Sequence, residues 1–204
     1  MRWKLWGEGR KQQGGSALAQ GENFVRGTTD KILNALQGRL GAEQLQKVRE
    51  ALDLTCSLHG DQKERPDGPY INHVLRVTER IVNLFGVLEP DVVVAALLHD
   101  VVEDQAEKLA ALHGADVNAS VRVRALAYIE GRFGAGVTRI VEGVTNTEET
   151  EPLSDEEWRR QYVEHVRIAI EDAKVLPVKL SDFMDNGLTI EAVTDPAKKL
   201  KLGR

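Results

Sequence analysis

The segment AALLHDVVED brings one imidazole and three carboxylates directly after a run of apolar residues. If the segment is helical, His99 and Glu103 lie one turn apart on one line of its surface, and Asp100 and Asp104 lie on a second line. The residues before them are apolar on every side, which predicts a buried helix. Charged groups in an interior are costly unless they are paired or bind a metal. The segment therefore suggests a metal site, with a packed core histidine as the alternative.

Two further helices are expected to bring polar groups into apolar surroundings. His73 follows a predicted helix start at Pro69, and Asp182 lies within the apolar segment VLPVKLSDFMDN. Taken alone, each could be a packed histidine or a salt-bridged aspartate. Together with His99 and Asp100 they form a mixed nitrogen and oxygen set, which suits a borderline or hard divalent cation such as Mn, Fe, Co, Zn or Mg.

A divalent cation in such a site lowers the pKa of water toward neutrality and neutralises charge on a phosphoryl oxygen. Glu103 and Asp104 follow the expected ligands by one helical turn, where they could transfer a proton by general acid–base catalysis. These residue types together suit metal-assisted hydrolysis of a phosphate compound.

Further polar residues lie near two of these segments. Asn186 and Thr189 follow Asp182 at spacings of four and seven, so the three residues share one helix face. Lys63 and Arg65 lie in the turn-rich loop before Pro69 and are available for an anionic ligand.

The composition of the 204-residue chain excludes several classes of protein. A net charge of −5 gives no overall attraction to nucleic acid or to an anionic membrane. No apolar run is long enough to span a bilayer. The single cysteine, Cys56, excludes a disulfide framework and favours a reducing compartment. We expect a cytoplasmic protein without a membrane or nucleic-acid partner, whose oligomeric state the sequence leaves open.

Apolar residues recur at helical spacing from Thr29 onward, and the alternation typical of strands is absent. The fold class is therefore predicted to be all-α, with about eight to ten helices. We expect residues 1–27 to form a flexible basic arm, 28–192 one domain and 193–204 a tail. The expected helices lie within residues 29–40, 45–58, 69–86, 90–104, 104–115, 121–133, 137–144, 154–170 and 175–190.

Four segments resemble, in order, the hydrolase domain of the RelA/SpoT family, including the single-domain small alarmone hydrolases of the HD superfamily. They are HGDQKERPDGPYINHVLRV, AALLHDVVED, RFGAGVTRIVEGVT and VLPVKLSDFMDN, and the resemblance covers residues 45–190. It implies an HD-superfamily helical bundle. It also implies one Mn²⁺ bound by His73, His99, Asp100 and Asp182.

The same resemblance implies a reaction and further site residues. The reaction is removal of the 3′-pyrophosphate from ppGpp or pppGpp, which gives GDP or GTP and pyrophosphate. Glu103 and Asp104 match the pair assigned to water activation and proton transfer, and Asn186 and Thr189 match residues that contact the nucleoside.

Three positions depart from the family pattern. An arginine that stacks on the base in the family is matched here by Glu64, between Lys63 and Arg65. The arginine after the metal aspartate is Phe183, and a lysine that often follows Gly-Val-Thr is Asn146. Fewer cations near the site would weaken binding of a highly charged substrate or favour another one.

Two alternatives follow from these departures. One is an HD-type hydrolase of another nucleotide, such as an adenosine alarmone. The other is a regulatory module that binds a nucleotide without hydrolysing it. The presence of both Glu103 and Asp104 argues against the second alternative, because binding alone does not need them.

Overall fold

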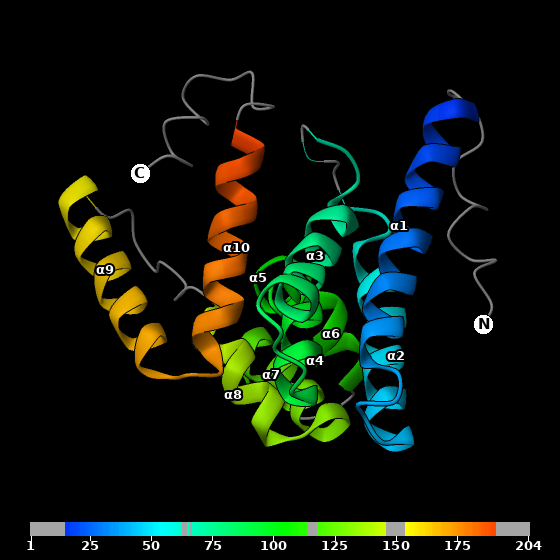
Figure 1. Cartoon of the computed structure of the whole chain (residues 1–204). Coiled ribbons are helices and arrows are strands. Elements are labelled where there is room, and N and C mark those ends of the chain that lie inside the picture. Colours follow the sequence, from blue (N-terminus) through cyan, green and yellow to red (C-terminus); the bar gives the residue numbers. More distant parts are fainter. Residues whose placement is uncertain (1–14, 63–64, 66, 114–117, 146–153, 191–204) are drawn as a thin grey trace.

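The computed structural model describes residues 15–62, 65, 67–113, 118–145 and 154–190, and these residues form helices joined by short connections (Figure 1). Among them there is no strand, and the one β-bridge pairs Arg65 with Gly68. The predicted all-α fold class is therefore confirmed. The elements are α1 (Gly15–Leu36), α2 (Ala42–His59), α3 (Tyr70–Glu79), the π-helical η2 (Arg80–Leu84), α4 (Pro90–Leu98), α5 (Val101–Asp104), α6 (Ala106–His113), α7 (Val121–Phe133), α8 (Ala135–Val144), α9 (Asp155–Glu171) and α10 (Val175–Thr189).

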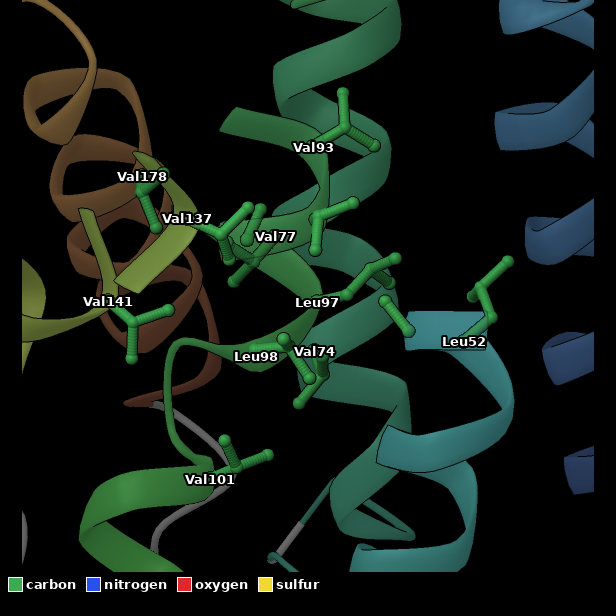
Figure 2. Packing of buried hydrophobic residues seen from close by; sticks show 14 of the residues in the cluster. Leu52, Val74, Val77, Val93, Leu97, Leu98, Val101, Val137, Val141 and Val178 are labelled. Atoms are coloured by element: carbon green, nitrogen blue, oxygen red, sulfur yellow. The ribbon is translucent and has the colours of Figure 1, made fainter. Parts of the chain in front are cut away.

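Helix α4 lies at the centre of the fold and is apolar all round, as its sequence predicts. Each of its residues from 92 to 98 is at most 1% exposed. It packs against α2, α3, α8 and α10, and α3 in turn lies between α1 and α10 (Figure 1). The core side chains come from all of these layers, as Figure 2 shows for Leu52, Val74, Val77, Val93, Leu97, Leu98, Val101, Val137, Val141 and Val178.

Helix α1 begins at Gly15, whereas the apolar pattern predicts a start near Thr29. Residues 15–27, which we expected to belong to the arm, are therefore helical, while residues 1–14 lie outside the described part of the chain. The physical reason is that Thr28 and Thr29 lie on the buried face of α1 instead of capping it. The apolar spacing of the buried face continues back to Val25, but these two polar residues interrupt it. The apolar pattern alone therefore does not indicate the first turns of the helix.

The expected central helix through Asp104 is divided in two. Helix α4 ends at Leu98, and α5 begins at Val101. The His99 ring forms a hydrogen bond through Nδ1 with the carbonyl oxygen of Ala96 at 2.8 Å. The last carbonyls of a helix have no backbone partner within the helix, and the His99 ring supplies one here. The Asp104 amide still donates to the Asp100 carbonyl at 2.9 Å, so the chain keeps nearly helical spacing across the division.

Helix α3 continues into the π-helical turn η2, which ends at Leu84, and Gly86 follows shortly after with φ of 68°. In this turn the amide of Phe85 donates to the carbonyl of Arg80, five residues back, at 2.9 Å. Single π turns within helices are common at functional sites, since the extra residue redirects the side chains around it. Here the side chain of Arg80 is directed toward α10.

The remaining helices follow the sequence pattern closely. Ser154 and Glu157 form a capping box at the start of α9, with the Ser154 amide donating to Glu157 Oε2 at 3.0 Å and the Glu157 amide donating to Ser154 Oγ at 3.4 Å. Helix α6 contributes to the core, because Leu109 and Ala110 are buried. Among the described helices, none combines the length and the apolar character required to cross a bilayer.

Candidate metal centre

Three elements bring two imidazoles and two carboxylates to one place in the interior. His73 comes from α3, His99 and Asp100 from the junction of α4 and α5, and Asp182 from α10. One ligand atom each of His73, His99 and Asp182 lies within 4.8 Å of the other two, the arrangement that a metal ion needs. The two histidines are almost completely buried, and the carboxylates are partly exposed.

The donor atoms face one another directly. The Nε2 atoms of His73 and His99 are 3.3 Å apart. Asp182 Oδ1 lies 3.3 Å from the His73 nitrogen and 3.8 Å from the His99 nitrogen. Asp100 Oδ2 lies 3.3 and 3.1 Å from the same two nitrogens. A set of two imidazole nitrogens and two carboxylate oxygens at these separations fits a single divalent cation.

The carboxylates strongly affect the protonation of the two histidines. Burial lowers the pKa of His73, but hydrogen bonds with Asp100, Asp182 and Asp185 outweigh it and raise the pKa to about 10. Burial also opposes the charged form of His99, and the charge of Asp100 raises its pKa. Burial opposes the charge of Asp100, yet the neighbouring imidazoles hold the pKa of that carboxyl well below its usual range. The site therefore stabilises positive charge.

This electrostatic arrangement predicts opposite pH dependences for the metal-free protein and for metal binding. The pKa of His73 is about 10 in the folded chain, against 6.5 for an unperturbed imidazole. Its contribution to the stability of the metal-free protein is complete below pH 6.5 and is lost as the pH rises toward 10. Metal binding must displace the same proton, so affinity should rise over that window.

Two titrations between pH 6.5 and 9.5 check this prediction, one of the melting temperature of metal-free protein and one of Mn²⁺ affinity. We expect the melting temperature to fall and the affinity to rise with pH. A Mn²⁺ affinity that stays constant across the window would show that no proton is displaced from the donor set.

A buried carboxylate that the sequence analysis missed lies behind His73. Asp185 is 1% exposed and accepts a hydrogen bond from His73 Nδ1 at 2.8 Å. Arg76 binds it through two nitrogens, with Nε 2.8 Å from Oδ1 and Nη2 2.9 Å from Oδ2. Arg80 Nη2 adds a third contact at 3.2 Å. Burial raises the pKa of Asp185, but the hydrogen bonds with His73 and Arg76 hold it well below its ordinary value.

Tyr70 is a second contributor that the sequence analysis missed. Its hydroxyl donates to Asp100 Oδ2 at 2.7 Å, and its ring stacks on His59 with the centroids 5.0 Å apart. The guanidinium of Arg65 lies over the same ring, 5.6 Å from the centroid. Tyr70 therefore links the metal centre to the loop that carries Arg65. Helical spacing could have indicated it, because Tyr70, His73 and Arg76 follow one another at intervals of three.

The structure brings three of the four expected substrate-binding residues together, and the fourth, Lys63, lies outside the described residues. Arg65 Nη2 donates to Asn186 Oδ1 at 2.8 Å and lies 3.5 Å from Thr189 Oγ1. Asn186 Nδ2 donates in turn to Asp182 Oδ1 at 2.9 Å. A chain of hydrogen bonds thus connects the Arg65 guanidinium to the metal centre.

Of the departures from the family pattern, Glu64 and Asn146 also lie outside the described residues, whereas Phe183 is 64% exposed.

The predicted turn of this loop is present as well. Arg65 and Gly68 exchange backbone hydrogen bonds of 2.8 and 3.0 Å, and Gly68 has φ of 123°, a conformation that favours glycine. The turn fixes the backbone of Arg65, whose guanidinium bonds to Asn186 of α10.

Glu103 and Asp104 are exposed and lie on α5, beside the metal centre in the chain. Gln62 Nε2 donates to Asp104 Oδ2 at 2.8 Å. The amide oxygen of Gln62 is held by Gln105 Nε2 at 2.8 Å and by the ring of His59. This orientation of Gln62 leaves its amide nitrogen directed at Asp104. His59, which the sequence assigns no role, is therefore part of the network around the site.

Comparison with known proteins gives consistent matches. A family profile described as HD domain matches residues 51–202. A guanosine-3′,5′-bis(diphosphate) 3′-pyrophosphohydrolase of Aquifex aeolicus is 28% identical over 157 residues, which cover 77% of this chain and 20% of that protein. The enzyme of that name called MESH1 in Mus musculus is 34% identical over 149 residues, which cover 72% of this chain and 70% of that protein.

A solved structure also matches, that of a metazoan ortholog of SpoT that hydrolyses ppGpp. Its TM-score is 0.55 with 26% identity, and the match covers 76% of this chain and 78% of that chain. This chain spans a fifth of the length of the Aquifex relative and 70% of mouse MESH1. The resemblance that the sequence motifs indicate is confirmed by these matches.

Proposed function

This chain belongs to the HD-domain family and is homologous to MESH1, and we propose that it removes the 3′-pyrophosphate from ppGpp or pppGpp. The products are GDP or GTP and pyrophosphate. The observation that carries the proposal is the approach of the His73 and His99 Nε2 atoms to within 3.3 Å of each other, flanked by Asp100 and Asp182. The Aquifex and mouse relatives are both named for this hydrolysis.

The residues present fit one resident divalent cation, held by His73, His99, Asp100 and Asp182. When bound, such a cation polarises a phosphoryl oxygen and lowers the pKa of water. We propose Mn²⁺, because two imidazole ligands suit Mn²⁺ better than Mg²⁺, which prefers oxygen ligands throughout.

The other side chains supply positioning and proton transfer. Glu103 and Asp104 act as the proton-transferring pair, and Gln62 holds Asp104 at one carboxylate oxygen. Arg65 supplies positive charge for the phosphates, and Asn186 and Thr189 contact the nucleoside, with Lys63 as a further cation of the loop. Because Arg65 lies over Tyr70 and bonds to Asn186, it can also take the stacking role that Glu64 cannot take. A cytoplasmic location, where such nucleotides occur, is part of this proposal.

Incubation of the Mn²⁺-loaded protein with ppGpp, pppGpp, ppApp and ordinary nucleotides tests the proposed function. We expect release of pyrophosphate from the guanosine 3′-pyrophosphates. Preferential cleavage of ppApp would instead identify an adenosine alarmone as the substrate. Binding of these nucleotides without any product would identify a regulatory module.

Replacement of Arg65 with alanine is expected to raise KM by about 10- to 100-fold and to change kcat little. A charge-assisted hydrogen bond contributes about 1.5–3 kcal/mol, and Arg65 supplies its charge to binding. Steady-state kinetics with ppGpp measure both constants. Arg132→Ala is the matched control, because Arg132 is half-exposed on α7 and pairs with Glu50. A KM equal to that of the control would remove Arg65 from the substrate site.

A further inference from the structure

The two histidines of the metal centre are supported in different ways. His99 Nδ1 bonds to the neutral carbonyl of Ala96 at 2.8 Å. His73 Nδ1 bonds to the carboxylate of Asp185 at 2.8 Å, and both of these side chains are 1% exposed. A charged acceptor on one nitrogen of an imidazole increases the basicity of the other nitrogen and fixes the ring.

Asp185 lies on the side of the His73 ring that faces away from the donor cluster. His73 Nε2 faces His99, Asp100 and Asp182, while its Nδ1 faces Asp185. A cation bound between the Nε2 atoms would therefore be reached by Asp185 only through the imidazole. This geometry makes Asp185 a support for a ligand and not a ligand itself.

Two arginines hold the carboxylate of Asp185 in this position. Arg76, one turn after His73, binds both oxygens in a two-pronged contact. Arg80, from the π turn η2, binds Oδ1 at 3.2 Å and also donates to the carbonyl of Ser181 at 3.0 Å. The carboxylate thus has charged partners for its two oxygens and remains available to the imidazole. This clamp connects α3, η2 and α10 behind the metal centre.

We propose that Asp185, held by Arg76 and Arg80, is a positioning residue that presents His73 Nε2 to the cation and strengthens cation binding. The inference rests on the proposed function only in taking His73 as a metal ligand. It assigns a role to a carboxylate that contacts neither the cation nor the substrate. In this arrangement the charge of Asp185 acts on the metal through the His73 ring.

The test is a titration of metal-free protein with Mn²⁺, followed by the electron paramagnetic resonance signal of free Mn²⁺. Asp185→Asn has nearly the same shape and can still accept a hydrogen bond, but it lacks the charge. We expect its dissociation constant for Mn²⁺ to rise by about 10- to 100-fold, the usual effect of losing the outer partner of a ligating histidine.

Asp67→Asn is the matched control. Asp67 pairs with Arg76, as Asp185 does, and among the described residues its ion pairs are with arginines and not with His73. Asp67 also lies 3.6 Å from Arg65, so this variant reports the effect of removing a carboxylate from these arginines without altering the contact between Asp185 and His73. Its Mn²⁺ affinity should stay within about twofold of the wild type. A purely structural role for Asp185 would lower the melting temperature of the metal-free variant and leave the affinity of folded protein equal to that of Asp67→Asn.

Equal Mn²⁺ affinities for folded Asp185→Asn and Asp67→Asn would overturn the proposal. If Asp185→Asn does not fold, Asp185→Glu is titrated in its place, because it keeps the charge opposite the arginines but displaces the carboxylate from Nδ1. A 10-fold or greater loss of affinity supports the proposal, and an unchanged affinity refutes it. This test does not depend on the identity of the substrate. If the wild-type protein binds Mn²⁺ but releases no pyrophosphate, the proposed function is wrong. The Mn²⁺ affinities of the variants can still be compared with that of the wild type, so the role of Asp185 is tested separately.

Discussion

Replacement of Asp182 with alanine is expected to abolish retention of the divalent cation and hydrolysis of ppGpp together. Asp182 is the donor that α10 contributes, and its Oδ1 lies 3.3 Å from His73 Nε2. Removal of a residue that hydrogen-bonds to a ligand lowers metal affinity by up to about 100-fold. Removal of a ligand itself should lower the affinity by more than this. Asn186 would also lose the acceptor that orients its amide.

Metal analysis after gel filtration and an assay of released pyrophosphate measure the two effects of Asp182→Ala. Asp53→Ala is the control, because Asp53 is an exposed carboxylate on α2 away from the donor cluster. Full activity in an Asp182→Ala protein that contains no metal would refute a metal-dependent mechanism.

Replacement of Glu103 with glutamine is expected to leave the cation bound and to lower kcat by about 10²- to 10⁴-fold. This is the range that a positioned general acid or base contributes. Glutamine preserves the size of the side chain but cannot accept a proton at physiological pH. Glu103 lies on α5, after His99 and Asp100 in the chain, and is not one of the four proposed ligands. We therefore expect the ligand set to be unaltered by the change.

Single-turnover kinetics at saturating Mn²⁺ measure the chemical step of Glu103→Gln directly. Glu107→Gln is the matched control, since Glu107 is an exposed carboxylate one turn further along, on α6. Turnover at the wild-type rate would remove the proton-transfer role from Glu103 and leave Asp104 as the remaining carboxylate of the pair.

The sequence could indicate the donor cluster because each of its members is a polar residue beside an apolar helix. Residues 92–98 are apolar on all sides, so the polar side chains that follow, His99 and Asp100, had to lie near the interior. His73 and Asp182 are likewise set among buried residues of α3 and α10. What the sequence could not supply is their mutual distance, which depends on how α3, α4 and α10 pack.

The carboxylate of Asp185 could not be distinguished by sequence alone. It lies three residues after Asp182 on α10, and either aspartate satisfies the same helical pattern. Only packing shows that one faces His73 Nε2 and the other faces His73 Nδ1. The contacts of Arg76 and Arg80 with Asp185 span more than 100 residues, so no local pattern reveals them.

The early start of α1 was missed for a different reason. Its buried face includes two threonines, and threonine is also a common residue at the N-terminal cap of a helix. The sequence pattern of one continuous helix therefore looks like the start of a new helix at these threonines. The division between α4 and α5 likewise depends on the His99 side chain, which bonds to the carbonyl of Ala96. Side-chain to backbone bonds of this kind alter helix ends without changing the apolar pattern.

Anomalous scattering from a crystal of the Mn²⁺-loaded protein tests most directly that these donors hold one cation. We predict one manganese peak for each chain, within bonding distance of His73 Nε2, His99 Nε2 and a carboxylate oxygen each of Asp100 and Asp182. A fully loaded crystal in which the manganese peak lies elsewhere, or in which any of these four side chains points away from it, would contradict the assignment.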